Sequence, residues 1–401
     1  MLATMMCLGE LSCAFPHSGS FQHYALMFMP SPVWSYTIGW LYWFSWGFSL
    51  AADLTAAGFI AHQFFPAVPV YIFCLAILLI LTVINFTSAK SFGECEYWLS
   101  AIKVFAIVLF ICAGGVMIYS LMGHSGLAPD VKNRWNVVSP RLGADCGLHD
   151  DCDLLLPGGG ELVGNTAGET ESPHIILPKV ILGIGLRIIL FYSLAIAVLA
   201  LVYPHKLAPN GQSPFVWVFS HAGIPGADTL MTLVIISAAN SAIYASSRML
   251  WSMAGDRFAP ACFGKTNGGG VPVYAILITV LLALVSLLTR YIPAQQFYLY
   301  LIASTGQVSC LAWITIGWCQ YRFRQSVRNG TYASDLLRYR SPLFPWTARF
   351  VIITNFAIMV GTWFSEQGGV IMLVELAFMT GILLSWYLFR PTLSRLRNTV
   401  G

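Results

Sequence analysis

Two ionisable side chains lie inside long apolar stretches of the chain. Lys103 lies six residues after Tyr97, inside the run 97–120, and Asp53 lies in Ala-Ala-Asp-Leu-Thr-Ala-Ala. An ionisable side chain inside an apolar membrane helix is unfavourable unless it is uncharged, paired with an opposite charge or turned towards a cavity. We therefore predict that Lys103 exchanges a proton or contributes to an ion site. The alternative is that its side chain extends to the membrane surface. Asp53 either pairs with a cation of the protein or faces a pathway and favours basic ligands.

A glycine-rich segment, 158–173, carries three carboxylates and ends at a proline. Backbone amides and carbonyls that stay open at membrane depth can bind a small ligand. We expect Gly159 and Gly160 to supply such groups, and Glu161 to bridge two half-helices or hold a proton. Glu169 is predicted to belong to a gate near an exit, whereas Glu171 is more simply a solvated loop charge.

An aromatic pair, Tyr42 and Trp46, lies four positions apart and so on one face of a predicted helix. Aromatic stripes at this spacing usually serve packing. An aromatic face that lines a pathway can also hold an ammonium group by cation–π attraction. Both interpretations of the pair remain open from the sequence.

Potential metal ligands crowd one polar stretch before the glycine-rich segment. They are Cys146, His149, Asp150, Asp151, Cys152 and Asp153. Their spacing fits no zinc motif, so we predict no metal site and attribute the cluster to composition. At membrane depth each charged centre would raise the free energy of insertion by about 2.5–3.5 kcal/mol. Together these charges would cost more than the apolar residues of one helix recover.

The composition that surrounds these residues is that of a membrane protein. Hydrophobic residues make up 57% and charged residues 9% of the 401 positions, whereas soluble domains have about 25% charged residues. No basic patch interleaved with aromatics indicates nucleic-acid binding. The 10 cysteines lie mostly singly in apolar runs, which argues against a disulfide framework. The first residues do not resemble a cleavable signal peptide.

Apolar runs long enough to span a bilayer recur along the chain, and each is too long for a barrel strand. They cover 33–60, 68–89, 97–120, 180–203, 228–254, 272–289, 296–319, 348–364 and 369–389. A short opening run, 1–15, and a polar-interrupted segment, 143–165, add to these. We therefore expect one all-α integral membrane domain over 1–401, with about ten to eleven helices.

The basic residues predict the orientation of these helices. If the link 16–32 is cytoplasmic, alternate loops and the C-terminal tail are cytoplasmic too. Those loops then contain most of the basic residues, including Arg248, Arg257, Arg322 and Arg324. We interpret Arg322, Arg324, Arg338 and Arg340 as determinants of topology. The same pattern requires 143–165 to cross the membrane.

Long motifs resemble the amino acid permeases of the amino acid–polyamine–organocation superfamily. LGELSCAFPHSGSFQHYALMF at 8–28 is similar to the end of their second helix and the following loop, and IGWLYWFSWGFSLAADLTAAG at 38–58 to the third helix. SFGECEYWLSAIKVFAIVLF at 91–110 resembles the fifth, GGELVGNTAGETESP at 159–173 the sixth, and SAANSAIYASSRMLWSMAGDRFAP at 237–260 the eighth. Ala-Ala-Asp-Leu, the following Phe-Phe-Pro and Tyr321-Arg322-Phe323-Arg324 most resemble bacterial lysine-specific permeases.

The resemblance implies an inverted-repeat (5+5) transporter fold whose first and sixth helices are broken at mid-membrane. It implies that the breaks bind the substrate's charged ends, that Lys103 couples transport to protons, and that Glu10 is a gating residue. Asn240 and Ser241 would bind an ion or the substrate amine, although small polar residues there also serve helix packing. No cofactor and no covalent chemistry are expected. The expected substrate is a cationic amino acid such as lysine, imported across the plasma membrane, that is, the bacterial inner membrane.

Two departures from the family pattern bear on activity. The chain opens within the second helix, so the first helix is expected to be missing. The sixth helix is disrupted, because CGLHDDCDLLLPGGG stands where the family has an apolar run. If the reading frame is shifted by one base, the codons of Leu148 to Pro157 can encode an apolar sequence. We therefore hypothesise a pair of compensating frameshifts around 141–158. The alternatives are a non-functional permease remnant, or a permease for neutral amino acids or polyamines.

Overall fold

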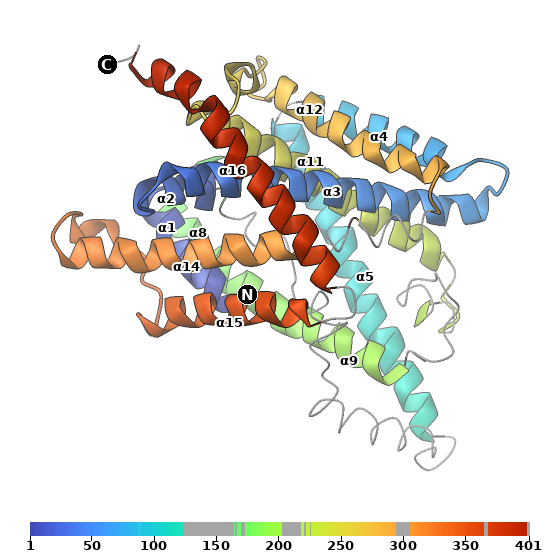
Figure 1. Ribbon diagram of the computed structural model, residues 1–401. Coiled ribbons are helices and arrows are strands. Elements are labelled where there is room, and N and C mark those ends of the chain that lie inside the picture. Colours follow the sequence, from blue (N-terminus) through green and yellow to red (C-terminus); the bar gives the residue numbers. More distant parts are fainter. Residues whose placement is uncertain are drawn as a thin grey trace.

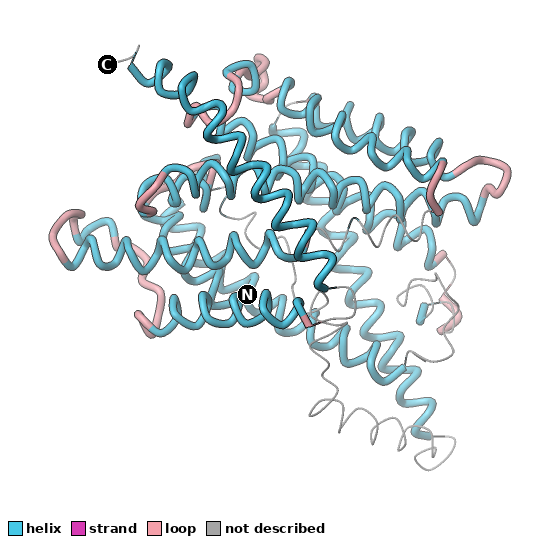
Figure 2. Tube along the Cα trace, viewed as in Figure 1, coloured by secondary structure: helices cyan, strands magenta, loops and turns pink. Residues whose placement is uncertain are grey.

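The computed structural model describes most of the chain as helix. The described residues are 1–87, 89–123, 164, 167–169, 173–202, 218–219, 222–224, 226–293, 301, 305–364 and 368–398. Within these ranges the regular elements are helices and no strand is present (Figure 2). The all-α prediction is confirmed for this part of the chain.

The helices follow the predicted apolar runs. They are α1 Leu2–Ala14, α2 Ser20–Phe28, α3 Pro32–Phe64, α4 Val70–Phe86, α5 Ala89–Gly123, η1 Ala167–Glu169, α8 Pro173–Arg187, the π-helix η2 Ile188–Tyr192, α9 Ser193–Val202, α11 Ala227–Gly255, η3 Ala261–Gly264, α12 Val273–Ala283, η4 Leu284–Arg290, α14 Gly306–Arg328, η5 Ser334–Leu336, α15 Trp346–Trp363 and α16 Gly368–Asn398. The run 180–203 is divided among α8, η2 and α9. The segment 143–165 lies outside the described residues except for Gly164.

Four described helical stretches are long and apolar enough to cross a membrane by length and composition. They are Pro32–Phe64, Glu96–Tyr119, Asp228–Gly255 and Val273–Arg290. Shorter apolar helical stretches cover Leu2–Ala14, Val70–Phe86, Leu190–Leu199 and Met372–Leu388. The chain is therefore a multi-pass membrane protein, as its composition predicted.

The long helix α3 is central to the packing. Pro32 occupies its first turn, and the hydroxyl of Ser31 accepts a hydrogen bond from the amide of Val33 at 3.3 Å, so the start is capped. Proline can start a helix because its missing amide hydrogen would have no intrahelical partner there. α3 packs against α2, α4, α11, α12, α14 and α16, and lies beside α11 in Figure 1.

Other helices form pairs around α3. α14 lies beside α15, α1 packs on α8 and α14, and α5 packs on α9 and α11 (Figure 1). Large apolar side chains of α5 remain exposed, among them Phe105, Val116 and Tyr119. An exposed apolar face of this kind suits contact with lipid.

Three links lie together at one end of the bundle. His23 of α2 lies 3.4 Å from Asp256, which follows α11. Phe15, which follows α1, has its ring 5.6 Å from that of Tyr332, in the link after α14. The predicted orientation places the link 16–32 and the links 256–272 and 329–345 on one side of the membrane. Their proximity fits a common side, and the assignment of that side to the cytoplasm stays a prediction.

Several arginines do not lie in loops as expected. Arg322 and Arg324 lie within the last turns of α14, because this helix extends to Arg328, about nine residues beyond the end of the predicted run 296–319. Arg248 lies inside α11, is 5% exposed and stacks over Tyr244 at 5.0 Å. The expected placement of Arg248, Arg322 and Arg324 in loops was wrong, because all three lie in helices; the role of Arg322 and Arg324 in determining topology stays a prediction.

Candidate functional site

An ion pair on α5 is the most polar feature between the long helices. Lys103 Nζ lies 3.3 Å from Glu96 Oε1, and the two side chains are 27% and 24% exposed. The residues are seven positions apart, two helical turns, so they share one face. Ser100, between them, donates a hydrogen bond to Glu96 Oε1 at 3.3 Å. The predicted intramembrane lysine is therefore a paired lysine.

Two polar side chains of helix α11 form hydrogen bonds with this ion pair. Ser241 Oγ donates to Glu96 Oε1 at 2.8 Å, and Asn240 Nδ2 donates to Glu96 Oε2 at 3.0 Å. Lys103 Nζ is also 3.4 Å from Ser241 Oγ. Both carboxylate oxygens thus accept hydrogen bonds, so Glu96 is held by side chains of α11 as well as of its own helix.

Helix α4 joins the same network through Asn85. Its amide group donates to Asn240 Oδ1 at 2.8 Å and to the carbonyl of Leu81 at 2.9 Å. Asn85 is 6% exposed and Asn240 is fully buried. The network of Asn85, Glu96, Lys103, Asn240 and Ser241, called here the polar network, therefore connects α4, α5 and α11.

Helix α3 contributes the other predicted site residues. Lys103 is a cation that acts on Asp53 electrostatically, and the expected roles of Asp53 as an ion-pair partner or as a pathway residue stay predictions. Tyr42 is buried, and its ring packs edge-on against Phe21 at 4.8 Å and Trp46 at 5.9 Å. The shared face of Tyr42 and Trp46 is thus confirmed by direct contact. Whether either ring contacts substrate stays a prediction.

The predicted gating residue Glu10 lies in a second cluster, at the end of the bundle. Its buried carboxylate accepts hydrogen bonds from Arg324 Nε at 2.5 Å and Arg324 Nη2 at 2.8 Å. Gln320 Nε2 donates at 3.1 Å and the amide of Ser341 at 2.7 Å. Glu10 therefore connects α1 to α14 and to the link before α15, and its gating role stays a prediction.

The glycine-rich segment is described only in part. Gly159, Gly160 and Glu161 lie outside the described residues, as does the polar stretch 146–153. Glu169 ends η1, and its gating role stays a prediction. A Cβ on Gly168 would lie 2.6 Å from the backbone nitrogen of Ser18, so η1 closely approaches the link after α1.

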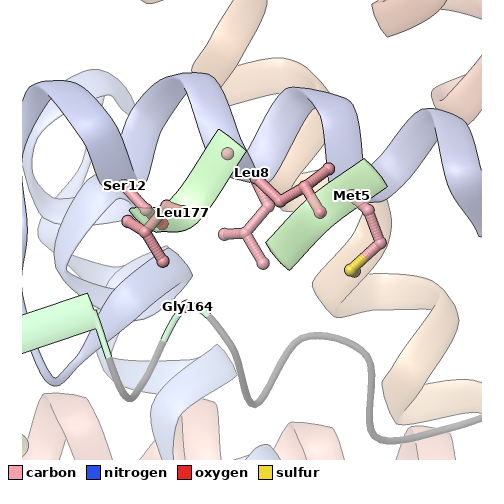
Figure 3. A pocket seen from close by; sticks show the side chains of 7 residues that line it. Met5, Leu8, Ser12, Gly164 and Leu177 are labelled. Atoms are coloured by element: carbon pink, nitrogen blue, oxygen red, sulfur yellow. The ribbon is translucent and has the colours of Figure 1, made fainter. Parts of the chain in front are cut away.

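A small cavity lies where α1 meets α8 and Gly164 (Figure 3). Met5, Leu8, Gly9 and Ser12 line it from α1, Leu177 and Ile181 from α8. The space for the centres of water-sized molecules is about 10 Å³, enough for about one water. It is apolar apart from Ser12 and is too small for an amino acid.

Two functional side chains were missed by the sequence analysis. Glu96 was passed over although its seven-residue spacing from Lys103 places both on one helix face. Arg324 was taken as a loop residue, and its pairing was not foreseen because its partner Glu10 is 314 positions away in the sequence. No local pattern in the sequence indicates a pairing across that separation.

An all-helical membrane protein with charged side chains buried between its helices has the general features of a transporter. Residues 1–390 match the family described as Amino acid permease, and the chain belongs to that family. Members of the family are transporters and not enzymes, as expected.

Curated relatives cover most of the chain and differ in their named substrates. The chain is 36% identical over 387 residues to the amino-acid permease RocE of Bacillus subtilis (strain 168), covering 94% of this chain and 82% of the relative. It is 37% identical over 373 residues to the lysine-specific permease LysP of Lactococcus lactis subsp. cremoris (strain MG1363), covering 89% and 73%. It is 35% identical over 386 residues to the histidine permease HisP of the same strain, covering 91% and 80%. The resemblance to amino acid permeases is therefore confirmed, and the chain is a multi-pass permease of the cell membrane.

Proposed function

We propose that the chain is a secondary transporter that imports a cationic amino acid, such as lysine, together with protons. The observation that carries this proposal is the polar network between α4, α5 and α11, with Asp53 of α3 in electrostatic range. It combines a carboxylate and an ammonium group within the apolar bundle, where charged groups usually serve transport.

The charges of this region favour a cationic side chain. Lys103 pairs with Glu96, so the carboxyl group of Asp53 is left as the acceptor that would favour a cationic side chain. An acceptor in a medium of low dielectric constant attracts a cation more strongly than it would in water. The ring faces of Tyr42 and Trp46 on the same helix as Asp53 would add cation–π attraction for an ammonium group.

Proton coupling is assigned to Lys103. When Lys103 is protonated, it donates to both Glu96 and Ser241. Loss of that proton would leave Glu96 with the hydroxyl and amide donors alone and so weaken the contact between α5 and α11. A change of proton state would in this way favour a different arrangement of the two helices.

The remaining parts of the proposal follow the family resemblance. The chain would form one integral unit with the inverted-repeat architecture, in which Gly159, Gly160 and Glu161 bind the substrate's backbone groups at a helix break. Asn240 and Ser241 would face the substrate amine or the coupling ion, and Glu10 and Glu169 would control the cytoplasmic exit. The relatives' names include lysine, histidine and gamma-aminobutyric acid permeases, which is why neutral amino acids remain the competing substrates.

Uptake into proteoliposomes tests this proposal. Labelled lysine should accumulate when an inward proton gradient is imposed, and unlabelled arginine should compete better than leucine or a polyamine. Lys103→Gln should remove the response to the gradient, whereas Lys179→Gln, at an exposed lysine of α8, should retain it. Lysine uptake that ignores the gradient in the unaltered chain would rule out proton coupling.

A repaired variant of the chain distinguishes an active permease from a non-functional permease remnant. In it, the residues around 141–158 are replaced by the apolar string of the shifted reading frame. Uptake by this repaired chain together with none by the unaltered chain would show that the unaltered chain is a non-functional remnant. Equal uptake by both would contradict the frameshift hypothesis.

A further inference from the structure

Two histidines and an aspartate meet where the links lie together at the end of the bundle. His17 is in the link after α1, His23 is in α2, and Asp256 follows the last residue of α11. One ring nitrogen of each histidine and one carboxylate oxygen of Asp256 all lie within 4.8 Å of one another. The two imidazole rings are stacked, with centroids 3.7 Å apart. The sequence analysis considered only the 146–153 cluster for metals and missed this group.

One of the distances suits a small divalent cation directly, and one of the two stacked rings would rotate so that both ring nitrogens face the ion. His23 Nδ1 and Asp256 Oδ2 are 3.4 Å apart, and two ligand atoms at about 2.0–2.1 Å from a tetrahedral zinc are separated by about 3.4 Å. Two imidazoles and a carboxylate form a donor set that suits zinc and other borderline ions better than magnesium or calcium. Three protein ligands leave a position for water.

The surroundings bear on one ligand of the site and leave the others within reach of water. His17 Nδ1 now accepts a hydrogen bond from the amide of Gly19 at 3.0 Å, so a metal at this nitrogen would replace that bond. The side chains of His23 and Asp256 are 24% and 13% exposed, which leaves a route from water.

A neighbouring side chain holds the carboxylate in place. Gln22 Nε2 donates to Asp256 Oδ2 at 3.1 Å and to Ser35 Oγ at 3.0 Å. Outer contacts of this kind orient metal ligands and raise affinity. We propose that His17, His23 and Asp256 form a site for a borderline divalent cation, with Zn²⁺ as the preferred ion, that connects the α1–α2 link to the end of α11.

A bound ion would restrain these elements. α2 and the residues after α11 come from parts of the chain more than 200 positions apart, and here they are joined by the weak contacts of Asp256 with Gln22 and His23. A coordinated metal would replace the His23 contact by bonds to three side chains. The site depends only on these residues and not on the substrate proposed above.

Zn²⁺ binding to the full-length chain, purified in detergent and freed of metals by a chelator, tests the inference by titration calorimetry. We expect one equivalent to bind. His17→Gln and His23→Gln should each weaken the affinity at least about tenfold. The matched controls are His62→Gln, whose ring lies at the far end of α3, and Cys262→Ser, which removes an exposed thiol. Both controls should bind as the unaltered chain does.

A spectroscopic measurement covers the case in which a variant fails to fold. Co²⁺ added to the unaltered chain should give the visible bands of a four-coordinate nitrogen–oxygen site without a thiolate charge-transfer band. Unchanged affinity in folded His23→Gln, or loss of binding in Cys262→Ser, would overturn the proposal. A thiolate band in the unaltered chain would also overturn it.

Discussion

Replacing Arg324 with methionine would remove the cationic partner of a buried carboxylate while retaining an apolar stem of similar length. Glu10 is 1% exposed and accepts four hydrogen bonds, from Arg324 Nε and Nη2, from Gln320 Nε2 and from the amide of Ser341. The substitution removes two of these donors and leaves a carboxylate that the remaining two neutral donors cannot balance. The change therefore tests whether α1 and α14 are held together by this pair.

The expected penalty follows from burial. Breaking a buried ion pair by removing one partner lowers the free energy of unfolding by about 3–5 kcal/mol, since an uncompensated charge remains. An exposed pair would lose only about 0–1 kcal/mol. The double variant Glu10→Gln with Arg324→Met should recover a part of the loss, with a coupling energy of about 1–3 kcal/mol.

Reversible denaturation in mixed detergent micelles, followed by helical circular dichroism, measures these differences. Arg322→Met is the matched control, because Arg322 is exposed and only two positions away on α14. That control should change stability by less than about 0.5 kcal/mol. If Arg324→Met and Arg322→Met gave equal, small losses, the burial of the Glu10–Arg324 pair would be refuted.

Three further substitutions test other contacts. Glu96→Gln removes the charge that pairs with Lys103; because the pair is partly exposed, we expect a loss of about 1–3 kcal/mol in the same denaturation assay, and no loss would show that the pair does not form. Tyr24→Phe removes a buried hydroxyl that donates to the carbonyl of Phe15 at 2.9 Å and should lower stability by about 1–2 kcal/mol, measured in the same way. Gly168→Ala would place a methyl group against the backbone of Ser18 and should lose about 1–3 kcal/mol, while Gly93→Ala on α5, where nothing lies within 4 Å, should be neutral or slightly stabilising.

The positions of the helices could be predicted from the sequence because hydrophobic length is a local property. The runs 33–60, 228–254 and 348–364 agree with α3, α11 and α15 to within a few residues. The end of α14 was placed too early, since the described helix extends to Arg328 and its last turns carry arginines rather than apolar residues. An amphipathic end of this kind is not recognised by hydropathy alone.

Part of the candidate site could also be predicted. Lys103, Asp53, Asn240 and Ser241 stand out because polar side chains are unusual within apolar runs. Their association across α3, α5 and α11 could not be read from spacing, because helical periodicity determines which residues share a face but not which faces meet.

The sequence by itself determined the class of protein, the helical spans and the residues whose charge requires a partner. The tertiary structure alone decided who those partners are. Glu96 meets Asn240 across 144 positions, His23 meets Asp256 across 233, and Glu10 meets Arg324 across 314. The physical reason is that an unpaired buried charge is unfavourable wherever it lies in the chain, while the packing of distant helices determines which donor comes within hydrogen-bond distance.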